Sequence, residues 1–259
     1  MKNPTAIAAI ICAAGTSRRF LQRNSPHTGG IKKEYCPMRG AAGNTVLGSA
    51  VSVFASAPEI DIIVIVVPDD PLQGEAAARK ALPPELLDEK AHPVIQFVSG
   101  GSKRQDSVRY ALSALEAEAP AYVLIHDGAR PWVGCSLIRR VINAVKQYQA
   151  VVPLLPLAET PKETDIPFDG TNTVLIKNHL KRAFMGSAQT PQGFAFPAIL
   201  AAHRKAATEY AQIEFTDDAE IWAACGGAES VPVAAIPGEP ENRKITFPED
   251  IREANCIFG

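Results

Sequence analysis

Short apolar runs alternate with segments of helical periodicity along more than half of the chain, and this alternation limits the fold more than any other feature. The runs are rich in Val and Ile and cover residues 6–12, 60–67, 94–98, 122–125 and 150–155. Bare apolar runs of strand length suit strands that are buried on both faces of a parallel sheet. The chain is therefore expected to form a doubly wound, mostly parallel, Rossmann-like α/β sheet. In such a sheet, ligands lie beyond the carboxyl ends of the strands.

The segments between these runs supply the expected crossover helices. Residues 46–55 and 136–148 fit two of them, and Ser102 with Gln105 reads as a capping box at the start of a third. A β-rich excursion is expected at 156–180, where turn-forming and β-branched residues crowd together. Later helices are expected at 197–210, near 217–224 and after Thr246, with a strand at 231–236. The 259 residues suit a single domain carrying this excursion as an arm.

Composition excludes several classes of protein. The 26 Lys and Arg residues nearly balance the 28 Asp and Glu residues, so the cationic excess typical of nucleic-acid binding is missing. The five cysteines are scattered without a Cys-x-x-Cys pair, which indicates neither disulfides nor a zinc site and favours the cytoplasm. The apolar start is expected to be a strand and not a secretory signal, because Arg18 and Arg19 follow it closely. No apolar run approaches the roughly 18 residues that span a membrane.

The loop that follows the first expected strand is the first candidate site. It reads Ala13-Ala14-Gly15-Thr16-Ser17-Arg18-Arg19. Small residues let the backbone approach a ligand, and free N–H groups beside arginines can hold a phosphate. The spacing matches neither a dinucleotide-binding fingerprint nor a P-loop, so a dehydrogenase or a P-loop ATPase is disfavoured. A plain tight turn with a solvated basic pair remains the alternative.

Seven further motifs follow in order along the chain. They are Lys32-Lys33-Glu34-Tyr35, Gly100 to Val108, His126-Asp127-Gly128-Ala129-Arg130-Pro131, Pro156 to Thr160, Arg182 placed before Gln189-Thr190-Pro191-Gln192, Thr216-Asp217-Asp218-Ala219, and Asn242-Arg243-Lys244-Ile245-Thr246. Together with the first loop they resemble the 2-C-methyl-D-erythritol 4-phosphate cytidylyltransferases of the non-mevalonate isoprenoid pathway. The resemblance runs from about Ile7 to Ile251, and it implies the nucleotide-diphospho-sugar transferase type of sheet.

The resemblance implies an enzyme that joins CTP to a sugar-alcohol phosphate and releases pyrophosphate. Arg19 and Lys33 would contact the triphosphate, and Arg182 and Lys244 would complete the catalytic set. Such chemistry needs fixed positive charge more than a base. The Tyr35 register favours Lys33, with Lys32 as the alternative and a Lys32 substitution expected to be mild. The connection between Arg19 and Lys33 is longer than the family usually has.

Binding residues are implied in the same way. The nucleotide would be held by Ala13, Ala14, Gly15, Gly100, Gly101, Arg104 and Ser107. The sugar-alcohol phosphate would be held by Asp127, Arg130, Thr160, Arg182 and Lys244. Asp127 and Arg130 could instead form an ion pair that braces a loop, and Asp217 with Glu220 reads as a helix cap. No dedicated metal site is expected, and Mg²⁺ or another divalent ion would be held mainly by the CTP phosphates.

The resemblance also implies a homodimer in which the arm at 156–180 packs on the neighbouring subunit. A ribitol 5-phosphate cytidylyltransferase is the nearest alternative, since its nucleotide loops would look nearly alike. A catalytically idle nucleotide-binding protein on the same scaffold is a more distant alternative. No nucleic acid and no membrane are expected among the partners.

Overall fold

A computed structural model describes residues 5–22, 31–38, 45–88, 91–226 and 231–251 of the chain. Its centre is an eight-stranded sheet in the order β10-β5-β9-β4-β1-β2-β3, with β8 paired to β5. The strands of this sheet are β1 (Ile7–Cys12), β2 (Ile62–Val67), β3 (Val94–Ser99), β4 (Tyr122–Asp127), β5 (Ala150–Pro156), β8 (Gly186–Ala188), β9 (Gln192–Ala195) and β10 (Ala234–Pro237). The α-helices are α1 (Arg18–Gln22), α2 (Val46–Ala55), α3 (Glu75–Lys80), α4 (Arg104–Ala114), α5 (Cys135–Tyr148), α6 (Phe196–Glu209) and α7 (Asp218–Cys225).

The sheet is mostly parallel, as the apolar runs predicted. β3, β2, β1 and β4 pair in parallel, and β10 pairs in parallel with β5. β9 lies between β4 and β5 and is antiparallel to both. The carboxyl ends of β1, β3 and β4 therefore share one edge of the sheet, the edge at which the sequence placed the ligands.

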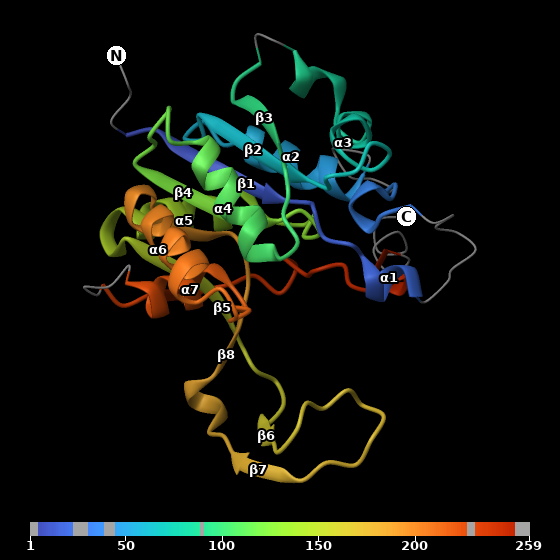
Figure 1. Cartoon of the computed structure of the whole chain (residues 1–259), viewed down its shortest axis with the longest axis vertical. Helices are drawn as coiled ribbons and strands as arrows, with labels where there is room; N and C mark the ends of the chain where they lie inside the picture. Colours follow the sequence, from blue (N-terminus) through green and yellow to red (C-terminus); the bar gives the residue numbers. More distant parts are fainter. Residues whose placement is uncertain (1–4, 23–30, 39–44, 89–90, 227–230, 252–259) are drawn as a thin grey trace.

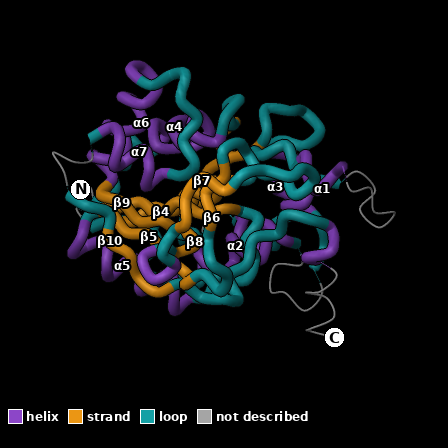
Figure 2. The backbone as a smooth tube through the Cα atoms, turned by 90° about the horizontal axis from the view of Figure 1, so that it is seen from below, coloured by secondary structure: helices purple, strands orange, loops and turns teal. Residues whose placement is uncertain are grey.

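Helices cover both faces of the sheet (Figure 2). The core on one face joins strand residues to the apolar sides of α4, α6 and α7, and includes the fully buried Trp222. The core on the other face joins them to α2 and α5. The buried side of α5 follows helical spacing through Leu137, Ile138, Val141 and Val145, which explains why this segment is a helix.

Several expected boundaries need correction. The expected capping by Ser102 is wrong: α4 begins at Arg104 after Lys103, and no side chain caps it. β10 begins at Ala234 rather than Val231. The sequence analysis missed α3 and β9. The last expected helix covers residues 248–251, up to the limit of the described part. Residues 23–30 of the long connection before Lys33 lie outside the described part.

The excursion after β5 stands away from the body of the protein (Figure 1). It contains a two-stranded sheet of its own, in which β6 (Lys162–Thr164) pairs antiparallel with β7 (Ile176–His179). The chain then returns through a short 3-10 helix, η3 (Arg182–Phe184), to β8 on the main sheet. Within the described ranges, none of the helices has the length and apolar character needed to cross a membrane.

Candidate active site

A pocket of about 360 Å³ opens at the shared carboxyl edge of β1, β3 and β4. It lies where a doubly wound sheet binds its ligands, and its size is within the range of small-molecule sites. The predicted site residues that line it are Ala14, Gly15, Arg19, Lys33, Gly101, Arg104, Ser107, Asp127 and Lys244. Five separate motifs thus meet in one cavity.

The loop after β1 forms one wall of the pocket. Gly15, Thr16, Arg18 and Arg19 are exposed there, and the last two begin α1. Within the described part of the chain, the backbone N–H groups of Gly15 and Thr16 donate to no other residue. Free N–H groups beside two guanidinium groups make a site for an anion. Ala13 does not line the pocket: it is fully buried beneath the loop.

The two neighbouring lysines have different surroundings. Lys33 lines the pocket, and its Nζ donates to the carbonyl of Ile245 at 3.0 Å. Burial lowers the pKa of Lys33 below the ordinary lysine value. Lys32 is only 2% exposed, and its Nζ lies 2.9 Å from Oε2 of Glu34. The structure therefore places Lys33 at the pocket, and the burial of Lys32 removes the ground for expecting its substitution to be mild.

The opposite wall comes from the turn between β3 and α4. A Cβ atom on Gly100 would lie 2.4 Å from the Cβ of Ala14, so only glycine allows these two loops to touch. The N–H of Gly101 donates to Oγ of Ser107 at 3.1 Å. This bond ties the turn to the first turns of α4, and it uses the serine that the sequence assigned to the nucleotide.

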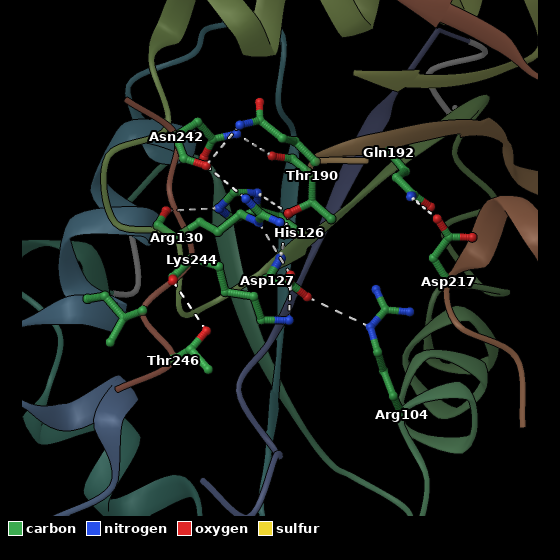
Figure 3. A network of polar contacts seen from close by, with 12 residues as sticks. Arg104, His126, Asp127, Arg130, Thr190, Gln192, Asp217, Asn242, Lys244 and Thr246 are labelled. Atoms are coloured by element: carbon green, nitrogen blue, oxygen red, sulfur yellow. Dashed lines mark hydrogen bonds and ion pairs between the residues drawn. The ribbon is translucent and has the colours of Figure 1, made fainter. Parts of the chain in front are cut away.

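Asp127 lies at the end of β4 among three cations (Figure 3). Its carboxylate oxygens are 3.0 Å from Nζ of Lys244, 3.4 Å from Nε of Arg130 and 3.7 Å from Nε of Arg104. Burial alone would raise the pKa of Asp127, but Lys244, Arg104 and Arg130 hold it well below its usual range. The carboxylate is therefore ionised at neutral pH, and the cations around it leave this end of the pocket positive.

His126 holds the end of β4 in place through two contacts of its ring nitrogens. Its Nε2 faces the carbonyl of Arg130 at 3.2 Å, and its Nδ1 faces Oγ1 of Thr190 at 3.1 Å. Because a carbonyl can only accept, Nε2 carries the proton and Nδ1 accepts from Thr190. Thr190 in turn accepts the N–H of Asp127. Burial lowers the pKa of His126 to about 4, so this histidine stays neutral and orients its neighbours. Thr190 belongs to one of the motifs noted in the sequence, but this role was not predicted from it.

A second buried contact holds Arg104 and was missed by the sequence analysis. Nη2 of Arg104 lies 2.8 Å from Oδ2 of Asp218, which is completely buried. The other oxygen of Asp218 lies 3.2 Å from Nε2 of the buried His203 on α6. Although burial raises the pKa of Asp218, Arg104 and His203 lower it to about 2. Asp218 belongs to the motif Thr216-Asp217-Asp218, which was interpreted from the sequence as a helix cap. The first aspartate, Asp217, does cap α7.

Besides Ala13 and Gly100, three predicted residues do not line this pocket. Arg130 pairs with Asp127 and donates to the carbonyl of Asn242 at 2.8 Å, the loop-bracing arrangement that the sequence left open. Thr160 and Arg182 are exposed at the base of the excursion. There Arg182 donates to the carbonyl of Ala158 and borders a separate cleft between β5, η3 and β10.

Comparisons with known proteins show the family of the chain. The profile of the 2-C-methyl-D-erythritol 4-phosphate cytidylyltransferase family (IspD) matches residues 7–259. The chain belongs to this family. Its relatives include the bifunctional enzyme IspD/IspF of Rhodospirillum rubrum, which is 39% identical over 97% of this chain and 57% of its own length. The bifunctional enzyme IspD/IspF of Mesorhizobium japonicum is 36% identical over 96% of this chain and 54% of its own length.

Solved structures of this family share the fold. The 4-diphosphocytidyl-2C-methyl-D-erythritol synthase of Anaerococcus prevotii superposes with a TM-score of 0.72 and 28% identity, over 99% of this chain and 97% of that one. The chain spans a little over half the length of the bifunctional relatives that it matches. It is a mixed α/β family member with a mostly parallel central sheet.

Proposed function

We propose that this chain transfers the cytidylyl group of CTP to 2-C-methyl-D-erythritol 4-phosphate. The observation that carries the proposal is the pocket itself. It is lined by the exposed loop at Gly15 and Thr16, by the turn at Gly101, and by basic side chains that include Arg19, Lys33, Arg104 and Lys244. Family membership supplies the identity of the two substrates. The product would be 4-diphosphocytidyl-2-C-methyl-D-erythritol, an intermediate of isoprenoid synthesis.

The proposed reaction is an in-line displacement at the α-phosphorus of CTP. A phosphate oxygen of the sugar-alcohol phosphate attacks this phosphorus, the bond to the bridging oxygen breaks, and pyrophosphate leaves with that electron pair. No proton has to be removed from the attacking phosphate dianion, so the protein mainly positions and neutralises charge. Arg19 and Lys33 would stabilise the charge that grows on the triphosphate, while Gly101 and Ser107 would hold the nucleoside.

A divalent cation can be bound in this pocket without a full set of protein ligands. Among the described residues, no group of three His, Cys, Asp or Glu side chains could hold a metal ion. Three carboxylate residues line the pocket, Glu34, Asp127 and Glu214, and the cations around Asp127 keep it ionised. Mg²⁺ is characteristically held by substrate phosphates and water with one or two carboxylates. We therefore propose Mg²⁺ or a similar ion that is held mainly by CTP, with Asp127 as its nearest protein ligand. The ion would neutralise phosphate charge.

We further propose that the chain acts as a homodimer through the excursion at 156–180, in the cytoplasm. Large apolar side chains are exposed on the excursion and at its base: Ile166, Phe168, Leu175, Ile176 and Phe184. A two-stranded hairpin is marginal alone, and clustered apolar exposure is typical of an interaction surface. A partner would bring Thr160 and Arg182 toward its neighbour's pocket to grip the incoming phosphate. Free thiols at the described cysteines suit a reducing compartment.

Pyrophosphate release from CTP tests the proposed function. Purified protein with Mg²⁺ is supplied with methylerythritol phosphate or, separately, with ribitol phosphate. Release with the first substrate and little with the second supports the proposal. The reverse preference would identify a ribitol phosphate enzyme. Tight CTP binding without release from either substrate would favour an idle nucleotide-binding protein.

A further inference from the structure

A buried ion pair contacts the loop after β1. Lys32 and Glu34 are 2% and 3% exposed, and the atoms Nζ and Oε2 are 2.9 Å apart. Removing a lysine and a carboxylate from water costs several kcal/mol, and packed apolar residues would often serve stability as well. The pair also does not supply net charge to the anion site, because each charge offsets the other. Its presence therefore needs another explanation.

Both members of the pair hold the loop after β1. Nζ of Lys32 also donates to the carbonyl of Gly15. Oε2 of Glu34 also accepts from Oγ of Ser17 at 3.0 Å. Two residues of the loop, separated only by Thr16, are thus tied to two residues that flank Lys33. The loop and Lys33 have a fixed relative position through these bonds.

The two bonds set the direction of the backbone. The Gly15 carbonyl accepts from Nζ of Lys32, which is only 2% exposed, so this carbonyl is directed at a buried ammonium group. Ser17 has a φ of +52°, in the left-handed region that residues with a side chain rarely adopt. The bond from Ser17 to Glu34 helps to hold that conformation. With the carbonyl turned back, the free N–H groups of the loop can face an anion.

We propose that Lys32 and Glu34 are positioning residues that keep the loop in its anion-binding conformation. This inference rests on the proposed function, because it assigns a triphosphate to the loop. It gives the two adjacent lysines different tasks: Lys33 meets the phosphates, and Lys32 shapes the backbone that meets them. Because Lys32 acts through the Gly15 carbonyl, its effect on binding is separable from its effect on stability.

Two variants separate positioning from simple stabilisation. Lys32→Met leaves Glu34 buried without its partner, so it lowers both the melting temperature and ligand affinity. The double variant Lys32→Met with Glu34→Gln removes the unpaired charge and regains much of the melting temperature. Its affinity for inorganic triphosphate, measured by calorimetry, stays about tenfold weaker, because the Gly15 carbonyl still has no charged donor. A double variant that binds triphosphate as tightly as the parent would overturn the proposal.

A milder variant covers the case in which these proteins do not fold. Ser17→Ala removes one hydrogen bond to the Glu34 carboxylate and leaves the Lys32–Glu34 ion pair in place, and it is expected to weaken triphosphate binding several-fold. Ser56→Ala, on the far end of α2, is the matched control. Unchanged binding by Ser17→Ala would contradict the proposed role of Glu34. If the parent protein binds triphosphate but not CTP, the proposed function fails while the loop inference stands. If it binds neither, both fail.

Discussion

In the proposed reaction, single residues contribute to this site mainly by placing positive charge beside the triphosphate. We expect Arg19→Ala and Lys33→Ala each to lower kcat by about a hundredfold or more, the scale of a lost electrostatic donor. Turnover at saturating CTP measures this. Both side chains reach the pocket from its rim, so the fold should survive. Lys146→Ala on the exposed side of α5 is the control. Near-normal turnover in both variants would remove these residues from the mechanism.

The lowered pKa of Lys33 gives a second expectation at this scale. Burial disfavours its ammonium form, so the side chain loses its proton at a lower pH than a free lysine. If the ammonium is needed, kcat/KM falls on the alkaline side as the pH rises through that lowered pKa. Lys33→Arg keeps the charge at all accessible pH values and should move this alkaline limb upward. An unchanged limb in Lys33→Arg would assign the titration to another group.

Asp127 provides the third expectation. If the divalent ion is held mainly by CTP and shares Asp127, excess chelator should abolish turnover and added Mg²⁺ should restore it. Asp127→Asn should raise the Mg²⁺ concentration that gives half-maximal activity, since an amide is a weaker ligand for Mg²⁺ than a carboxylate. Activity is measured over a Mg²⁺ titration at fixed CTP. Full activity in excess chelator would disprove the metal requirement.

Between elements, the contact of α4 with α6 and α7 depends on one buried carboxylate. Asp218→Ala removes the partner of the pocket-lining Arg104 and of the buried His203, and we expect a loss of about 3 kcal/mol in the free energy of unfolding. Asp217→Ala on the neighbouring position removes only a helix cap, with an expected loss of about 1 kcal/mol. Denaturant unfolding compares the two. Equal losses would show that Asp218 is also only part of the cap.

The same elements show what the sequence could predict. Strands buried on both faces leave a bare apolar run, so β1, β2, β3, β4 and β5 were predicted close to their observed bounds. β9 was not, because its four residues include Gln192, whose side chain is buried by a specific bond to Asp217. No periodicity signals such a strand, which the main sheet imposes by pairing it with β4 and β5. Ser102 was misread because its hydroxyl donates to the Asp106 carboxylate instead of accepting from the helix backbone, and α4 begins only at Arg104.

The site shows the same division. Motif resemblance identified the residues that meet in the pocket, since loops at one sheet edge converge wherever the sheet is parallel. It favoured Lys33 through the Tyr35 register but left Lys32 as the alternative, because the two are chemically alike and only the fold buries Lys32. It gave no role to the contact of Asp218 with Arg104 and His203, which are distant in the sequence. Buried partners of this kind carry no local pattern.

For the whole molecule, the excursion decides whether each active site is complete within one chain. Arg182 borders a cleft at the base of the excursion, Thr160 is exposed nearby on the excursion, and both lie outside the pocket of their own chain. The exposed apolar residues around them need a cover, and a second copy can supply it through two-fold symmetry. If so, each site combines Arg19 from one chain with Arg182 from the other. Two variants that are inactive alone should then complement each other.

Mixing Arg182→Ala chains with Arg19→Ala chains tests this arrangement. In a mixed dimer, one site carries both substitutions and the other carries neither. Random exchange at equal amounts makes half of the dimers mixed, so about a quarter of the parent activity should return, rising toward a half if mixed dimers dominate. Subunit exchange is verified with two differently tagged chains, and each variant alone is the control. If exchange is demonstrated and no activity returns, each site uses its own Arg182, and the excursion serves assembly without completing the neighbour's pocket.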